Sequence, residues 1–240
     1  MEEDYRKGCP KAIKCDKDIK LYSGNLTIST HGQGGEGIES KETLHAYKAT
    51  VVADTFDDCF NTGACCYIDG AHIYCLSHNN DGIDSNGCII VTDGIVASVN
   101  ESKPNESFDS EDGQFHLLGG TVFGIGSGPV DVMESVHPCY TMPYNENEGV
   151  RSQGFILTEN KYISILKGNE VVMTLQNDNK AFRSFITFTS PSFTNNETLT
   201  ISEGDYPSGI QKSLFDGRPT FGGFPCNSRQ IADIQVQTIQ

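Results

Sequence analysis

Acidic side chains recur at regular intervals in the first half of the sequence and could together bind a cation. They flank an apolar residue in successive short segments: Glu36, Asp58, Asp81 and Glu106 precede it by two residues, and Glu39, Asn61, Asp84 and Asp109 follow it by one. If the segments stack, neighbouring carboxylates lie about 5 Å apart and repel by roughly 3 kcal/mol at an effective dielectric constant near 20. Such oxygen-rich positions suit Ca²⁺, so the pattern predicts calcium on these eight residues. The alternative is that Asp and Asn only cap turns.

A repeated unit must position these acids. Its central apolar residues are Ile13, Ile38, Phe60, Ile83 and Phe108, which gives a period of 22 to 25 residues. Each repeat adds two apolar runs that alternate with period two and are separated by a Gly/Asp/Lys-rich turn, which indicates strands. Three short strands and three turns per repeat predict an all-β fold. We expect a single-stranded, right-handed parallel β-helix of about five to six coils, each burying its apolar face on the next.

The alternation also predicts which residues face the inside of the tube. Four columns result: Ile19, Leu44, Cys66, Ile89 and Phe115; Leu21, Ala46, Ile68, Val91 and Leu117; Leu26, Val51, Ile73, Val96 and Val122; Ile28, Ala53, Cys75, Ser98 and Gly124. Each column should stack into a ladder of like side chains.

The C-terminal part of the chain breaks this pattern. Residues 155–157, 162–166, 171–175 and 182–188 read as longer strands joined by hairpin turns such as Lys167-Gly168-Asn169. A solenoid needs a cap over its open end. We therefore divide the chain into a lead-in (1–10), coils (11–149) and an antiparallel, strand-rich cap packed on the end of the helix (150–240).

These features resemble a known family. The repeats of the type Gly82-Ile83-Asp84-Ser85, each followed by a strand, a turn like Gly119-Gly120 and a second strand, are similar to those of secreted bacterial carbohydrate-binding β-helix proteins. That family was described as cellulose- and pectin-binding, with a fold similar to pectate lyases. Residues 161–164, 168–169, 182–185 and 189–191 resemble the strands that close its helix, and the resemblance covers roughly residues 12–205. The nine Cys are more than the family leads us to expect.

The resemblance implies a protein of the cell surface, the periplasm or the medium that binds plant cell-wall or other polysaccharide, carries Ca²⁺ on its acidic turns and has no demonstrated catalysis. Two outward ribbons are candidates for sugar contact: His45, Tyr67, Ile90 and His116, and Val52, Tyr74, Ala97 and Phe123. Trp, the favoured sugar platform, is absent from the chain. The alternative is that another part of the protein covers these outer residues.

Two other functions stay open on the sequence. A pectate-lyase-like enzyme would need Ca²⁺ and a basic residue near the acidic turns. The candidates within the coils are Lys41, Lys48, Lys103 and His116, each of which also reads as an ordinary solvated side chain. A surface adhesin or structural rod would use the β-helix without any sugar ligand.

Composition narrows the classes of partner. The 17 Lys and Arg against 32 Asp and Glu give a net charge of −15, which argues against nucleic-acid binding. No apolar run is long enough to span a membrane, and the first residues lack the apolar core of a secretion signal. We expect a monomer. Cys65 and Cys88 occupy equivalent positions in adjacent repeats and are candidates for a disulfide, with free thiols as the alternative.

Overall fold

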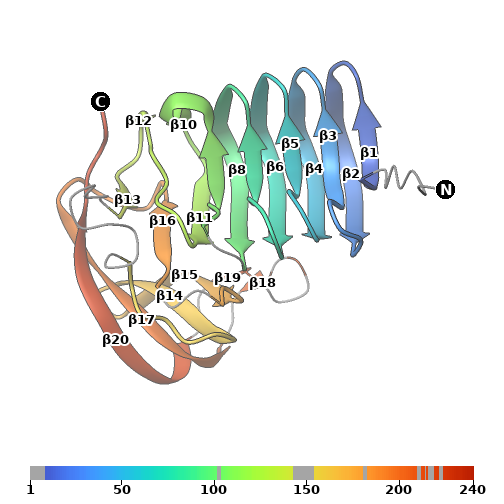
Figure 1. The fold of residues 1–240 in the computed structure, drawn as a ribbon. Helices are drawn as coiled ribbons and strands as arrows, with labels where there is room; N and C mark the ends of the chain where they lie inside the picture. The colour runs from blue at the N-terminus through green and yellow to red at the C-terminus, as the bar shows by residue number, and fades with distance from the viewer. Residues whose placement is uncertain are drawn as a thin grey trace.

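The chain winds into stacked coils that run from the N-terminal end toward a separate C-terminal sheet (Figure 1). This computed structural model describes residues 9–101, 104–142, 154–180, 183–209, 212–213, 215, 219–221 and 224–240. One side of the coils is a five-stranded parallel sheet made of β1 (Lys11–Cys15), β3 (Glu36–Ser40), β5 (Phe60–Thr62), β7 (Ile83–Ser85) and β9 (Phe108–Ser110).

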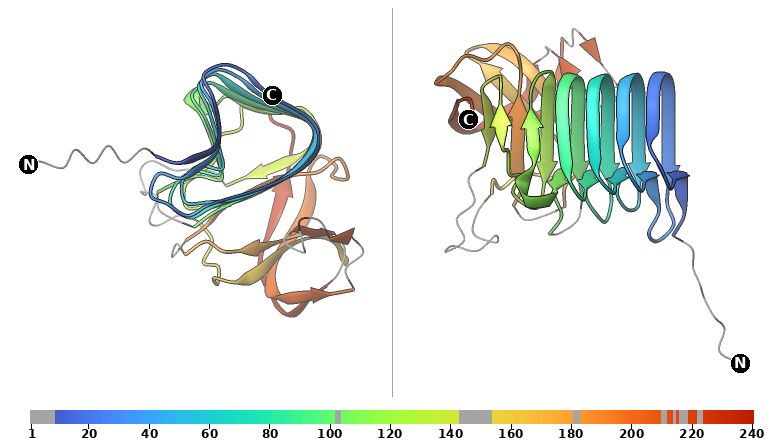
Figure 2. Two further views of the ribbon diagram at one scale, coloured as in Figure 1. Left: turned by 90° about the vertical axis from the view of Figure 1, so that its right-hand side faces the viewer. Right: turned by 90° about the horizontal axis from the view of Figure 1, so that it is seen from above.

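The rest of each coil belongs to a long strand that bends around a corner. These strands are β2 (Ile19–Thr30), β4 (Leu44–Thr55), β6 (Cys65–Ser77) and β8 (Cys88–Asn100), and the fifth coil splits into β10 (Phe115–Leu117) and β11 (Thr121–Gly126) after the short 3₁₀ helix η1 (Glu111–Gly113). Viewed along the axis, the coils superimpose on one closed outline (Figure 2). At the corner of β8, Gly94 has a φ of 106°, and a Cβ atom there would lie 2.1 Å from the Ala71 carbonyl oxygen.

The register within these strands confirms the four inward columns. Leu44 pairs with Cys66 and Ala46 with Ile68, and the same alignment continues through Ile89 and Val91 to Phe115 and Leu117. Most members of the columns are fully buried in one core that runs the length of the tube. Each coil thus buries its apolar face against its neighbours, which confirms an all-β solenoid of parallel stacked coils. Its right-handed winding stays a prediction.

The C-terminal region forms a six-stranded antiparallel sheet. Its strands are β14 (Lys161–Lys167), β15 (Glu170–Asn177), β17 (Glu197–Ser208), β18 (Lys212–Ser213), β19 (Pro219–Phe221) and β20 (Phe224–Val236). The expected hairpin at residues 167–169 is present, because β14 and β15 pair antiparallel on either side of it. Residues 155–157 do not form a strand; Phe155 makes only an isolated bridge with Ser184.

One C-terminal strand joins the solenoid itself. β16 (Phe185–Thr189) pairs antiparallel with β11 and with β13 (Cys139–Thr141), while the short β12 (Glu134–Ser135) pairs with β10. A second core joins Tyr74, Ala97 and Phe123 on the outside of the coils to apolar side chains of the antiparallel sheet. The C-terminal region therefore covers part of the flank of the solenoid as well as its end. Residues 1–8 and 150–153 of the expected segments lie outside the described residues.

Candidate functional site

The eight acidic and amide residues predicted to bind calcium do line up along the five-stranded sheet; we call them the acidic stripe. In the second column, the register pairs Glu39 with Asn61, Asn61 with Asp84, and Asp84 with Asp109. The stacking of the coils therefore brings Asp84 and Asp109 within one strand spacing of each other, whereas the neutral Asn61 separates Glu39 from Asp84.

The first members of the stripe have lysine partners. Lys11 lies opposite Glu36 in the ladder and forms an ion pair with it. Glu39 pairs with Lys41 and, at 2.8 Å, with Lys14. Burial raises the pKa of Glu39, but its two lysines outweigh this and hold the pKa below its usual value. Lys11 and Lys14 come from the first repeat, where they occupy the same two columns as the acids of later repeats, whereas Lys41 follows β3 in the second repeat.

The middle of the stripe is hydrogen-bonded within the protein. Asp58 Oδ1 accepts the backbone N–H of Asp81 at 3.0 Å, and its Oδ2 accepts the side-chain amide of Asn61 at 3.1 Å. Asp81 in turn accepts the backbone N–H of Glu106. These contacts link successive coils and match the turn-capping alternative, so Asp58 and Asn61 are engaged without a metal.

The last members of the stripe are partly buried and close to one another. Burial, followed by the charges of neighbouring carboxylates, raises the pKa of Glu106 to about 9 and that of Asp84 to about 7. The same causes raise the pKa of Asp58 to about 9 and, against a hydrogen bond from Glu106, that of Asp81 to about 6. Burial also raises the pKa of Asp109. Partly buried carboxylates that lie close together in adjacent coils therefore favour protonation or a bound cation.

The fit to a metal is therefore uneven along the stripe. Glu36 and Glu39 are held by lysines, and both carboxylate oxygens of Asp58 accept hydrogen bonds, one of them from Asn61, so these four do not fit a calcium ion. Among the described contacts, Asp81 differs from Asp58 because it accepts the Glu106 N–H through Oδ1 alone. The residues whose donor set suits Ca²⁺ are Asp81, Asp84, Glu106 and Asp109. Within the described residues, no three His, Cys, Asp or Glu side chains converge as a metal cluster.

An aromatic row runs across the outer face of the coils, perpendicular to the strands. The predicted ribbon of His45, Tyr67, Ile90 and His116 is in register, and the structure extends it to Lys20 at one end and Glu134 at the other. The ring centroids of His45 and Tyr67 are 4.6 Å apart, and His116 is hydrogen-bonded to Glu134 at 2.7 Å. Sequence reasoning missed Tyr22 and Tyr47, which extend the row from the next outward column, although the same alternation places them outward.

The geometry of these rings decides what they offer a ligand. Tyr22 and Tyr47 stack in parallel, with centroids 5.1 Å apart and planes 2° apart, and His45 lies 4.7 Å from Tyr47. Rings stacked along the axis cover one another's faces, so the row presents ring edges, hydroxyls and an imidazole to solvent. Tyr22, at the end of the stack, is 66% exposed. We call Tyr22, Tyr47, His45 and Tyr67 the aromatic row.

The second predicted sugar ribbon is buried. Tyr74 has no exposed surface and Phe123 is 4% exposed. The C-terminal region covers both: Phe215 lies 5.9 Å from Tyr74, and Phe188 lies 6.1 Å from Phe123 in an edge-to-face contact. Tyr74 and Phe123 are therefore core residues, and the expectation that they contact a ligand is corrected in favour of the covering alternative.

The structure shows which of the predicted cysteines form a disulfide, and where the basic candidates for lyase chemistry lie. Cys65 and Cys88 are paired in the ladder between β6 and β8 and form a disulfide, whereas Cys66 and Cys75 are buried thiols.

Lys41 is ion-paired with Glu39, and Lys48 is exposed at the corner of β4. Lys103 lies outside the described residues. No described helix is long and apolar enough to cross a membrane.

Comparisons with protein-family models, with curated proteins and with solved structures find no match for this chain.

Proposed function

We propose that this protein is a secreted or cell-surface binder of a linear polysaccharide, that it does not catalyse a reaction, and that it holds Ca²⁺ on the later part of the acidic stripe. The proposal follows the resemblance to carbohydrate-binding β-helix proteins, including their right-handed, pectate-lyase-like winding. The observation that carries it is the aromatic row, which is the largest group of aromatic side chains on the outer face of the described coils.

The row suits an extended polymer because its members repeat with the coils. Coils stack at about 4.8 Å, which is close to the rise of one sugar ring in an extended polysaccharide. Tyr47 and His45 are linked through Tyr47 Oη and His45 Nδ1 at 3.3 Å, so polar groups lie between apolar ring edges. Lys20, Asp69 and Thr92 add exposed hydrogen-bonding groups around the row. Hydroxyl-rich ligands need this mixture of apolar contact and hydrogen bonding.

Calcium would give the site a way to accept an acidic sugar. Asp81, Asp84, Glu106 and Asp109 would hold the ion, which would supply positive charge to a carboxylate of the polymer. Without it, a uronate chain would approach a protein of net charge −15 and be repelled. A neutral glucan would need only the aromatic row.

The disulfide supports placement outside the cytosol. Cys65–Cys88 joins adjacent coils, and such bonds persist mainly in oxidising compartments. By contrast, two of the candidate bases for lyase chemistry are already engaged. Lys41 is ion-paired with Glu39, and His116 is hydrogen-bonded to Glu134.

Binding to insoluble cellulose and to pectin, each with Ca²⁺ or with EDTA, tests the proposal. We expect retention of the native protein, and roughly tenfold weaker binding for Tyr47→Ala or Tyr67→Ala because each loses one aromatic contact. Tyr206→Ala is the matched control, since Tyr206 is 55% exposed but lies on β17 of the C-terminal sheet. Its binding should be unchanged.

Three outcomes would contradict the proposal. Equal losses in Tyr206→Ala and Tyr47→Ala would remove the aromatic row from the site. Absence of binding to any polysaccharide would favour a structural or adhesive rod. Release of unsaturated uronides from pectin would establish a lyase.

A further inference from the structure

Among the described residues, no strand covers the N-terminal end of the solenoid. β1 and β2 are the terminal strands of their sheets, so each has one edge without a strand partner among the described residues (Figure 1). β2 is 12 residues long, which makes it a long edge of free backbone N–H and C=O groups. Natural proteins protect or pair such edges, because they readily add another strand.

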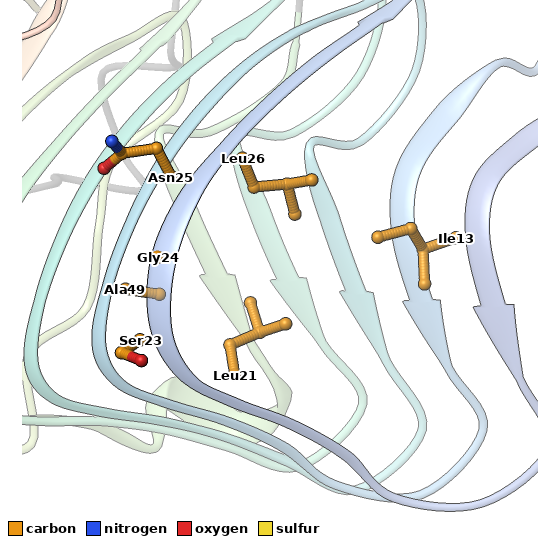
Figure 3. Close-up of a pocket in the computed structure, with 7 residues that line it drawn as sticks. All are labelled: Ile13, Leu21, Ser23, Gly24, Asn25, Leu26 and Ala49. Atoms are coloured by element: carbon orange, nitrogen blue, oxygen red, sulfur yellow. The ribbon is translucent and has the colours of Figure 1, made fainter.

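The apolar interior is also exposed at this end. A cavity of about 260 Å³ is lined by Ile13, Leu21, Ser23, Gly24, Asn25, Leu26 and Ala49 (Figure 3). Ile13, Leu21 and Leu26 point into the tube but are only half-buried, whereas Ile38, Ala46 and Val51 one coil further on have no exposed surface. Among the described residues, the first coil has no neighbouring coil on its N-terminal side, and a further strand with inward apolar side chains would supply one.

The sequence of β2 identifies a strand that fits. Its inward apolar residues are symmetric about the Ser23–Gly24 bond: Ile19 and Leu21 on one side, Leu26 and Ile28 on the other. We propose that a second copy of this chain covers the open end, by antiparallel pairing of the two β2 strands about a two-fold axis between Ser23 and Gly24. In this register Ile19 lies opposite Ile28 of the second copy, and Leu21 opposite Leu26, so apolar faces meet apolar faces.

The bend of β2 is compatible with this symmetry. Gly24 has a φ of 99° and marks the corner of the strand, so Leu21 and Leu26 lie on the two arms that leave the corner (Figure 3). β1 can follow the same axis, because its one inward apolar residue, Ile13, is at its centre. The two tubes would then share one continuous core.

The charge distribution favours this end for self-association. The chain has a net charge of −15, yet residues 9–31 contain four Lys and only two Asp. Lys11, Lys14 and Lys17 form ion pairs with acids of the second coil, so the end is close to neutral. The fourth lysine, Lys20, would lie opposite Thr27 of the second copy and meet no like charge. This dimer departs from the monomer expected from sequence.

A charge exchange on the exposed face of β2 tests the register. Lys20 and Thr27 are both exposed, so their replacement leaves the core intact. Thr27→Lys would place two like-charge pairs across the axis and weaken dimerisation about tenfold. Lys20→Glu with Thr27→Lys would convert both into opposite charges and restore it. Lys20→Glu alone is the control and should dimerise like the native protein.

The measurement is the mass of the full-length protein by analytical ultracentrifugation over a concentration series. We expect a monomer–dimer equilibrium in which Thr27→Lys dimerises more weakly than the native protein. Lys20→Glu and the double variant should dimerise like the native protein. A native protein that remains monomeric at every concentration would overturn the proposal and leave the open end to another cover, such as residues 1–8 or a foreign strand. A dimer that responds equally to Thr27→Lys and to the double variant would overturn the register.

Discussion

The two ends of the acidic stripe meet the same electrostatic problem in different ways. At the N-terminal end, Glu36 and Glu39 are buried but are paired with Lys11, Lys14 and Lys41. At the other end, Asp84 and Asp109 lie side by side in register, and no described residue supplies them with an ion pair. Both ends belong to the same parallel ladder, and the ion pairs of Lys11, Lys14 and Lys41 distinguish one end from the other.

This difference shows what a solenoid column requires. A column places one side chain from each coil next to the last. In the first column, Lys11 can neutralise Glu36 but not the three acids that follow in later coils. Beyond that point the column must take up protons or bind a cation. Burial and neighbouring carboxylates raise the pKa of Glu106 to about 9 and that of Asp84 to about 7. By contrast, the two lysines beside Glu39 lower its pKa despite burial.

The largest effect should come from removing a buried lysine at the paired end. Lys11 and Glu36 have side chains only 12% and 9% exposed. Lys11→Met would leave Glu36 as an uncompensated buried charge and should lower the free energy of unfolding by about 3 kcal/mol at pH 8. Burial raises the pKa of Glu36, so the loss should shrink at pH 4, where this carboxyl is protonated. Urea unfolding measures both values.

Lys17→Met is the matched control for that experiment. Lys17 pairs with Glu42 across the same two coils, but the side chains are 78% and 46% exposed. An exposed pair contributes little, so this variant should leave the free energy of unfolding almost unchanged. Similar losses in the two variants would show that burial does not distinguish the pairs.

The unpaired end should make stability fall as the pH rises. The folded-state pKa values of Asp81 (about 6), Asp84 (about 7) and Glu106 (about 9) exceed the value near 4 of an unfolded carboxyl. The folded protein therefore retains protons that the unfolded chain releases, and stability is lost between about pH 4 and pH 9. Ca²⁺ should reverse this, by about 2.7 kcal/mol at a hundredfold excess over its dissociation constant.

Thermal unfolding at pH 5 and pH 8, with Ca²⁺ or EDTA, separates the two ways of balancing the charge. A calcium-dependent rise in Tm at pH 8 that disappears in Asp84→Asn with Asp109→Asn would support the metal. The double variant should itself be more stable than the native protein at pH 8 without calcium. A native protein that shows the pH dependence but no response to Ca²⁺ would mean that protons alone balance the stripe.

The sequence allowed the periodic half of the fold to be predicted well. The repeat places Leu44, Cys66 and Ile89 in one column at spacings of 22 and 23 residues, and a column needs no information beyond the repeat itself. The lysines of the paired end were also readable, because Lys11 and Lys14 fall in the acid columns of the first repeat.

Features that depend on distant segments could not be predicted in this way. Tyr74 and Phe123 alternate outward like Tyr67, and only the covering strands far along the chain make them buried. Phe188 reaches Phe123 because β16 adds antiparallel to β11, a pairing between segments that share no repeat. Only part of the aromatic row was predicted from the sequence, because Tyr22 and Tyr47 belong to a column whose later members, such as Asp69, are polar.

The smallest effect concerns His78, which lies outside the acidic stripe. When protonated, it forms ion pairs with nearby carboxylates, as Lys11 does with Glu36. His78 lies between Asp54 at 2.7 Å and Glu101 at 2.9 Å, and Glu101 also pairs with Lys180, near Asp178 and Glu159. Burial lowers the pKa of His78, but the two carboxylates outweigh it and raise the pKa above its usual value. Its stabilisation is therefore full below about pH 6.5 and is lost as the pH rises through the folded-state value.

His78→Gln should accordingly cost roughly 1 kcal/mol at pH 5.5, discounted because the side chain is one-third exposed, and almost nothing at pH 9. His31→Gln is the control, since His31 is exposed and bonded only to the Ser29 hydroxyl among described contacts. A His78→Gln loss that is the same at both pH values would assign His78 a packing role. A loss confined to acidic pH would show that this solenoid balances neighbouring acids with a proton-dependent cation as well as with fixed lysines.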